Sequence, residues 1–123
     1  MLHTISPQDM QEMERACQKQ HFVERVFTED ERAYLDAKGK GRAKSAAAMF
    51  AAKEAVAKAL GTGFSSGVMP WQIEVTHDAL GAPGVALHDA ALARLGALGG
   101  ARVMLSLTHE KETAAAFAVA VGE

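Results

Sequence analysis

The sequence predicts a single α+β domain, residues 1–123, in which a small antiparallel sheet packs against one long central helix and shorter helices. A chain of 123 residues with 49% hydrophobic and 23% charged residues can fill one core but not two. An alanine-rich helical stretch occupies the middle of the chain, and segments of alternating apolar residues follow residue 71. No internal repeat or linker composition divides the sequence, so we expect one compact unit.

The first half of the chain is predicted to be helical. Residues 6–22 begin with serine and proline, which suit the N-cap and the first position of a helix. Residues 28–35 open with a Thr-x-x-Glu capping box. A basic loop with two glycines, residues 38–42, leads into the long helix over residues 42–60, which a Gly-Thr-Gly sequence ends. These signals predict helices joined by short turns.

The second half is predicted to contain the strands. Residues 71–76 and 84–87 are joined by a turn rich in glycine and proline, and a short helix over residues 88–98 follows. Residues 103–107 and 113–121 alternate as strands do and are joined through THEKE, which predicts a hairpin. One face of the first strand is expected to consist of Trp71, Ile73 and Val75.

Composition excludes several classes of protein. A net charge of −2 argues against a protein built mainly for nucleic acid. The sequence lacks both a long apolar run and the features of a signal peptide, so we expect a cytoplasmic protein. Its one cysteine, Cys17, cannot form an internal disulfide and is expected to be a partly buried thiol rather than a nucleophile.

The helix over residues 50–60 carries an acid and a base one turn apart, Glu54 and Lys58. Both fall on the border of an apolar stripe, where they form either a surface ion pair or part of a cleft. Lys53 lies within the stripe, where its stem can pack while its ammonium reaches outward to solvent. The predicted stripe consists of Ala46, Phe50, Lys53, Ala57 and Leu60.

Positive charge is concentrated before and along this helix. Residues 38–58 contain six basic side chains and one acid, Glu54. Such an excess is typical either of a solvated basic loop or of a site for a phosphate-rich ligand. The six are Lys38, Lys40, Arg42, Lys44, Lys53 and Lys58.

The string FAAKEAVAKALGTG, residues 50–63, resembles the signature of the 4′-phosphopantetheinyl transferases of the holo-acyl-carrier-protein synthase type. Three shorter stretches match the same family: DMQEMER at residues 9–15, G-x-P at residues 81–83 and Ser-Leu-Thr-His at residues 106–109. The chain departs from the family pattern in lacking a Gly-Ile-Gly lead-in before Asp9 and in carrying glutamate after the histidine.

The resemblance implies transfer of 4′-phosphopantetheine from coenzyme A to a serine of an apo acyl carrier protein, releasing 3′,5′-ADP. It implies that Asp9 and Glu54 hold Mg²⁺, with Mn²⁺ as the alternative ion. Glu54 would accept the serine proton, and Lys58 would neutralise charge on the phosphates. If Asp9 is instead a third-position helix acid, it would only favour the helix dipole.

The resemblance also implies where the partners bind. Arg15 and Arg25 would meet the acidic helix of the carrier protein, each being otherwise a solvated arginine. The expected form is a homotrimer with its sites between subunits, so a monomer would be inactive. With Glu54 and Lys58, His109 is implied to be catalytic, as the histidine that approaches the pyrophosphate; without the family it would be a histidine of a hairpin turn. Residues implied to contact coenzyme A are Arg42, Lys44, Lys58, Gly81, Pro83, Ser106, Thr108 and His109.

Two other interpretations stay open at this stage. The altered start before Asp9 would suit a catalytically impaired member that binds coenzyme A or docks a carrier protein, such as a domain related to a larger synthase. An unrelated phosphate-binding α+β domain would share the basic helix but would not prefer coenzyme A over other nucleotides.

Overall fold

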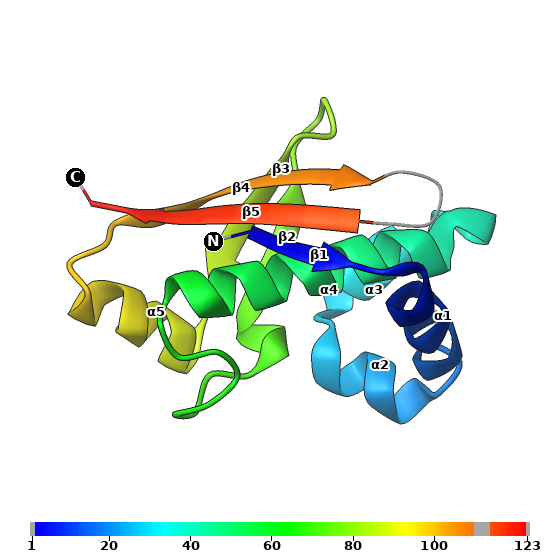
Figure 1. Ribbon diagram of the computed structural model, residues 1–123, viewed down its shortest axis with the longest axis horizontal. Helices are drawn as coiled ribbons and strands as arrows, with labels where there is room; N and C mark the ends of the chain where they lie inside the picture. The colour runs from blue at the N-terminus through cyan, green and yellow to red at the C-terminus, as the bar shows by residue number, and fades with distance from the viewer. Residues whose placement is uncertain (1, 110–113, 123) are drawn as a thin grey trace.

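The computed structural model describes residues 2–109 and 114–122, and it confirms the predicted α+β class. The long helix α4 (Arg42–Ala59) runs beneath an antiparallel sheet with the strand order β1-β5-β4, as Figure 1 shows. The strands are β1 (Leu2–Ile5), β5 (Ala114–Val121) and β4 (Arg102–His109). A second sheet pairs β2 (Ile73–His77) with β3 (Pro83–Leu87).

The N-terminal helices pack at one end of α4. They are α1 (Pro7–Ala16), α2 (Gln20–Val26) and α3 (Glu29–Asp36). The predicted capping box at Thr28 is confirmed, and Ser6 forms another. The single helix predicted over residues 6–22 is wrong, because a turn after Ala16 separates α1 from α2. The basic loop contains a short 3₁₀ turn, Gly39–Gly41.

Helix α4 is more deeply buried than predicted. Its alanines contact the sheet on one side and the N-terminal helices and β2 on the other, so the predicted one-sided stripe is wrong. Lys53 is fully buried, and its ammonium does not reach solvent as predicted. The buried alanines of α4 are Ala46, Ala47, Ala48, Ala51, Ala52, Ala55 and Ala57.

The C-terminal half agrees with most predictions. The helix α5 (Asp89–Ala97) has His88 as its N-cap, and β4 pairs with β5 as predicted, although residues 110–113 of THEKE lie outside the described residues. The placement of Trp71 in a strand is wrong. Pro70 opens a 3₁₀ turn, Pro70–Gln72, that delays the strand to Ile73 and leaves Trp71 exposed.

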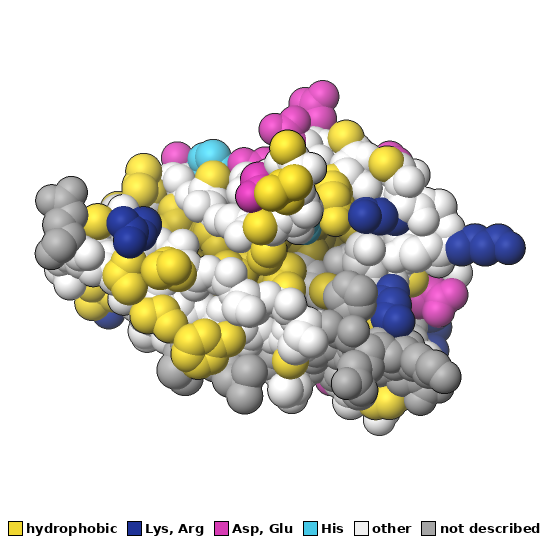
Figure 2. All heavy atoms as spheres, turned by 90° about the horizontal axis from the view of Figure 1, so that it is seen from above, with side chains coloured by type: hydrophobic (Ala, Val, Ile, Leu, Met, Phe, Trp, Pro, Cys, Tyr) yellow, Lys and Arg dark blue, Asp and Glu magenta, His cyan; other side chains and the backbone are white. Residues whose placement is uncertain are grey.

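The two faces of the β1-β5-β4 sheet differ in burial. Ala116 and Ala118 of β5 are buried on the face that packs on α4. On the outer face, Met104 is 55% exposed, Phe117 50% and Val119 37%. Figure 2 shows hydrophobic side chains gathered on the left of the surface seen from this side.

Two further observations concern the burial of Cys17 and the length of the apolar helices. Cys17 is buried at the end of α1, and desolvation raises the pKa of its thiol, as suits an inert cysteine. Among the residues that the structure describes, no helix is long and apolar enough to cross a bilayer.

Candidate functional site

Asp9 of α1 and Glu54 of α4 line the same cavity, which we call the acid cavity and which has a volume of about 350 Å³. The sequence placed these two carboxylates together only through a family resemblance, and the packing of α1 on α4 brings them to one place. The remaining lining residues are Glu12, Met13, Ala16, Phe22 and Phe50.

Asp9 has the helix-capping position that the sequence offered as one alternative, and it also lines the cavity. It is the third residue of α1, where its amide donates to Ser6 Oγ at 3.2 Å and its Oδ2 accepts from the Ser6 amide at 3.3 Å. Strand β1 has already ended at Ile5. The carboxylate therefore caps the helix while it also lines the cavity.

Asp9 and Glu54 suit a hard cation whose other ligands are waters and substrate phosphates rather than protein side chains. Within the described ranges 2–109 and 114–122, no cluster of three or more His, Cys, Asp or Glu residues could hold a metal. Mg²⁺ needs no such cluster, because it binds through one or two carboxylates, waters and substrate phosphates. Asp9 and Glu54 fit that donor set.

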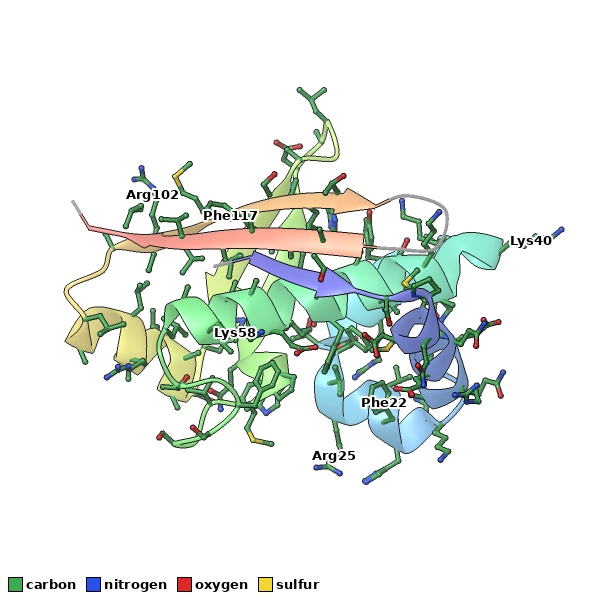
Figure 3. The ribbon with its side chains drawn as sticks, in the orientation of Figure 1. Phe22, Arg25, Lys40, Lys58, Arg102 and Phe117 are labelled. Atoms are coloured by element: carbon green, nitrogen blue, oxygen red, sulfur yellow. The ribbon has the colours of Figure 1, made fainter. Side chains whose placement is uncertain are left out.

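Lys58 follows Glu54 by one helical turn, in the C-terminal half of α4 (Figure 3). Glu54 is partly buried and Lys58 is exposed, in agreement with their predicted place at the border of the buried surface. The acid and the base are thus presented from a rigid helix.

The basic residues at the start of α4 have different surroundings. Arg42 donates from Nε to Asp36 Oδ1 at 3.3 Å and from Nη1 to the Cys17 carbonyl at 3.4 Å, so it ties α4 to the N-terminal helices. Lys44 and Lys40 line an open cavity of about 370 Å³ beside α1. Lys44, which is implied to contact coenzyme A, thus lines a cavity, and Arg42 has polar partners within the chain.

Gly81 and Pro83, predicted near the coenzyme, line another cavity of about 180 Å³ between α4, the β2-β3 sheet and β4. The rings of Tyr34 and His77 stack in its wall, with centroids 3.9 Å apart and planes 3° apart. Lys38 Nζ lies 4.6 Å from the centre of the Tyr34 ring. Sequence reasoning missed this stack, because no local pattern relates Tyr34 to His77; the four-residue spacing of Tyr34 and Lys38 could have indicated only their own contact.

Burial lowers the pKa of His77, and the nearby Lys38 adds to the effect. A neutral imidazole can stack on Tyr34 without placing a second charge beside Lys38. The Tyr34–His77 stack thus gives this cavity an aromatic portion of its wall, with Lys38 beside the Tyr34 ring.

Ser106 and Thr108 point away from the acid cavity. They pair with Phe117 and Ala115, which places both hydroxyls on the exposed outer face of the sheet. His109 is the last residue of β4, and its side chain lies outside the described part of the structure. The helix α4, which carries Glu54, packs on the opposite face.

Arg15 and Arg25 are both exposed, on α1 and α2. Arg25 projects from the lower edge of the molecule in Figure 3 and lines a mainly apolar groove of about 280 Å³. Phe22 lines both this groove and the acid cavity, so the two adjoin. The other groove residues are Lys19, His21, Val26, Met69 and Pro70.

Comparison with known proteins identifies the family. The family model described as the 4′-phosphopantetheinyl transferase superfamily matches residues 8–118. A holo-[acyl-carrier-protein] synthase of Solidesulfovibrio magneticus is 46% identical over 82% of this chain and 80% of its own. One of Treponema denticola is 42% identical over 93% of this chain and 92% of its own.

Solved structures of the same class share the fold. The holo-[acyl-carrier-protein] synthase of Neisseria meningitidis has a TM-score of 0.80 and 36% identity, covering 97% of this chain and 95% of its own. The synthase of Bacillus anthracis, solved in complex with CoA (3′,5′-ADP), has a TM-score of 0.77 and 31% identity, covering 99% and 94%.

Proposed function

This chain belongs to the 4′-phosphopantetheinyl transferase superfamily, and we propose that it acts as a holo-[acyl-carrier-protein] synthase. The serine hydroxyl of an apo carrier protein attacks the phosphorus that bears pantetheine in coenzyme A. A P–O bond forms to the serine, the bond to the bridging oxygen breaks, and 3′,5′-ADP leaves. The observation that carries this proposal is the shared cavity of Asp9 and Glu54.

The two acids of the cavity and Lys58 divide the chemical work. Asp9 and Glu54 would hold Mg²⁺, which supplies Lewis-acid polarisation of the phosphate oxygens when bound. Glu54 accepts the proton of the carrier serine, directly or through a water. Lys58 neutralises the negative charge that grows on the bridging and leaving oxygens. Each role requires the α4 side chains to stay fixed relative to α1.

Coenzyme A would be bound across two copies of the chain. Lys44 and the turn with Gly81 and Pro83 line cavities on one side of the sheet, whereas Ser106 and Thr108 stand on the other. In an assembly that places the outer face of one copy beside the acid cavity of its neighbour, Ser106, Thr108 and His109 of that copy would complete the neighbour's site. This arrangement supports an oligomer with its sites between subunits, for which the family resemblance implies a homotrimer.

The carrier protein would dock at the groove beside Arg25. An acidic helix with an apolar side chain complements a groove that has an apolar floor and a basic rim. Because Phe22 borders both the groove and the acid cavity, a docked helix can present its serine to Glu54. Arg15, exposed on α1, would extend the basic surface. The cytoplasmic location expected from the sequence stays a prediction.

A mass measurement tests the proposed function. The chain is incubated with coenzyme A, Mg²⁺ and an apo carrier protein, and the carrier is then weighed. We expect a gain equal to one phosphopantetheinyl group, lost when a chelator removes the metal. Binding of coenzyme A without any mass gain across several carriers would instead favour a catalytically impaired member of the family.

A further inference from the structure

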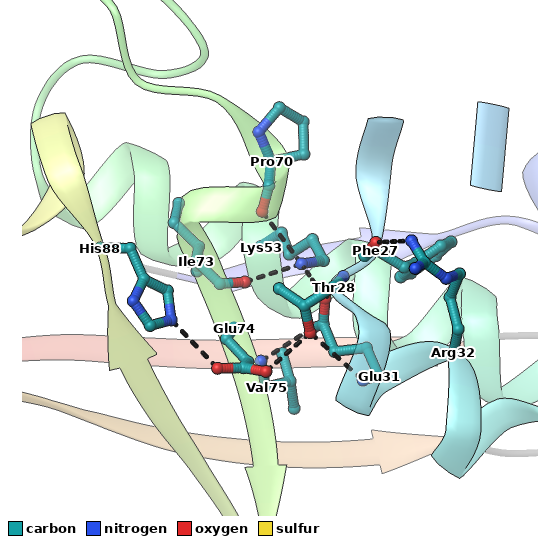
Figure 4. Close-up of polar contacts among 10 residues, drawn as sticks. All are labelled: Phe27, Thr28, Glu31, Arg32, Lys53, Pro70, Ile73, Glu74, Val75 and His88. Carbon is teal, nitrogen blue, oxygen red and sulfur yellow. Dashed lines mark hydrogen bonds and ion pairs between the residues drawn. The ribbon is translucent and has the colours of Figure 1, made fainter. Parts of the chain in front are cut away.

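Lys53 makes an unusually complete set of contacts for a buried lysine. Its Nζ donates to Glu31 Oε1 at 2.7 Å, to the Ile73 carbonyl at 2.7 Å and to the Pro70 carbonyl at 2.9 Å. Both side chains of the Lys53–Glu31 pair are 0% exposed. One ammonium thus connects α4 with α3 and with both ends of the turn that enters β2 (Figure 4).

Glu31 is itself fixed by the elements around it. Its Oε1 accepts from the Thr28 amide at 2.9 Å, and its Oε2 accepts from the Val75 amide at 2.8 Å. Thr28 Oγ1 donates to Glu74 Oε2 at 2.6 Å, and Glu74 Oε1 lies 3.0 Å from His88 Nε2. Lys53 is therefore held by a network that extends to the N-cap of α5, as Figure 4 shows.

Stability alone is a poor explanation of this pair. Burial raises the pKa of Glu31 and lowers the pKa of Lys53, and their mutual attraction opposes both shifts. The cost of removing both groups from water consumes much of the attraction, so apolar residues of similar volume often stabilise as well. Apolar residues cannot fix the orientation of a helix as hydrogen bonds do, because apolar contacts are not directional.

Helix α4 needs directional contacts to fix its rotation about its own axis. The surfaces that it buries consist largely of alanine, and methyl groups offer few deep ridges and grooves to fix the rotation of a helix about its axis. A rotation of 20° moves a side-chain end by roughly 2 Å, given a helix radius of about 5–6 Å with side chains. Displacements of that size separate two ligands of one cation.

Resting on the proposed function, we propose that Lys53 is a positioning residue: its buried hydrogen bonds fix the rotation of α4 so that the neighbouring Glu54 faces Asp9 across the acid cavity. Lys53 touches neither substrate nor metal. It acts through Glu54, the next residue on the same helix.

The test compares two variants that alter the core of the same helix. Lys53→Met/Glu31→Gln removes the ion pair but keeps the volume of both side chains. Val56→Ala, at a buried apolar position of α4, weakens packing without touching the network. Both are studied below their melting temperatures, with Mn²⁺ as the probe: electron paramagnetic resonance measures Mn²⁺ binding in the presence of coenzyme A, and transfer assays measure the half-saturating Mg²⁺ and the carrier KM.

We expect the double variant to bind Mn²⁺ about tenfold more weakly, as for outer partners of metal ligands, and its half-saturating Mg²⁺ to rise equally. The KM of the double variant for the carrier protein should equal that of the unmodified chain. The Mn²⁺ affinity of Val56→Ala should also equal that of the unmodified chain. Equal Mn²⁺ affinity in the double variant, or an equal loss in Val56→Ala, would overturn the assignment.

Two further outcomes keep the inference separable from the proposed function. If the double variant does not fold, Lys53→Met alone removes all three hydrogen bonds of the ammonium, while Glu31 keeps the Thr28 and Val75 amides as donors. Wild-type Mn²⁺ affinity in that folded variant contradicts the inference. If the unmodified chain binds Mn²⁺ but transfers nothing, the proposed function fails, while the Mn²⁺ affinities still decide the role of Lys53. No Mn²⁺ binding by the unmodified chain overturns both.

Discussion

The two faces of the β1-β5-β4 sheet illustrate how differently one small domain treats its surfaces. The inner face carries small, fully buried residues such as Ala116 and Ala118, and α4 closes it. The outer face carries larger apolar residues, of which Phe117 is 50% exposed, beside the hydroxyls of Ser106 and Thr108. One face is complete within the chain, whereas the other has the composition of a surface that another molecule covers.

The proposed site residues divide between the two sides in the same way. Asp9 and Glu54 line a cavity on the helical side, and Ser106 and Thr108 lie on the outer face. A single chain holds both sets but does not bring them together. Such a distribution favours a site completed by a second copy, and the following predictions test each side in turn.

The largest effect is expected on the helical side. Glu54→Gln keeps the size of a partly buried side chain but removes the carboxylate that would bind the metal and accept the serine proton. We expect kcat to fall by about 100-fold or more, with an unchanged circular dichroism spectrum. Glu12→Gln, which alters another acid of the same cavity, is the matched control and should retain most activity. Equal losses in both variants would contradict the roles assigned to Glu54.

The next effect concerns the outer face. Phe117→Asp places a charge in the exposed apolar surface, where a covering subunit would bury it unpaired. We expect analytical ultracentrifugation to show a folded monomer that has lost transfer activity. Leu80→Asp changes a leucine that is 96% exposed at the tip of the β2-β3 hairpin and should leave both properties unchanged. An oligomer that survives Phe117→Asp would argue that this face is not the interface.

A smaller effect is expected at the carrier groove. Arg25→Glu reverses a charge on its rim while the apolar floor stays intact. We expect the carrier KM to rise by about tenfold, with little change in kcat, because rim charges act mainly on association. The difference from the unmodified chain should narrow as salt is raised. A change confined to kcat would mean that Arg25 serves the chemical step instead.

The smallest effect concerns Glu74. Burial alone would raise the pKa of its carboxyl, but hydrogen bonds from Thr28 and His88 outweigh that effect, and the pKa is lowered. A lowered pKa in the folded state stabilises the protein above the unfolded-state pKa, and the benefit disappears as the pH falls through the folded-state value. Glu74→Gln should therefore cost about 1 kcal/mol at neutral pH. In acid, the free energy of unfolding of Glu74→Gln should approach that of the unmodified chain. Denaturant titrations at several pH values measure this difference, and a difference that stays constant as the pH falls would contradict the prediction.

Local signals in the sequence predicted much of this fold. Caps, glycine stops and alternating residues placed most helices and strands to within a few residues, because those signals act over short distances. The break after Ala16 and the 3₁₀ turn at Trp71 were missed, since packing against neighbouring elements decides them. The burial of Lys53 was missed for the same reason: its partner Glu31 lies 22 residues earlier, and the sequence does not relate them.

The candidate site was predictable to a different degree. Spacing along one helix places Glu54 and Lys58 together, but only the packing of α1 on α4 brings Asp9 to the same cavity. The stack of Tyr34 on His77 joins α3 to β2, and no local pattern relates those residues. Contacts within one helix follow from periodicity, whereas contacts between elements depend on tertiary structure.

Mixing two inactive variants tests most directly whether the site is shared between subunits. Glu54→Gln disables the helical half and His109→Ala the sheet half, and the two chains are co-expressed with different tags so that mixed oligomers can be purified. We predict that each variant alone is inactive and that purified mixed trimers recover about one third of the sites, because one of the three interfaces in each mixed ring pairs an intact Glu54 with an intact His109. Mixed oligomers that stay as inactive as either parent would show that both halves must reside in one chain.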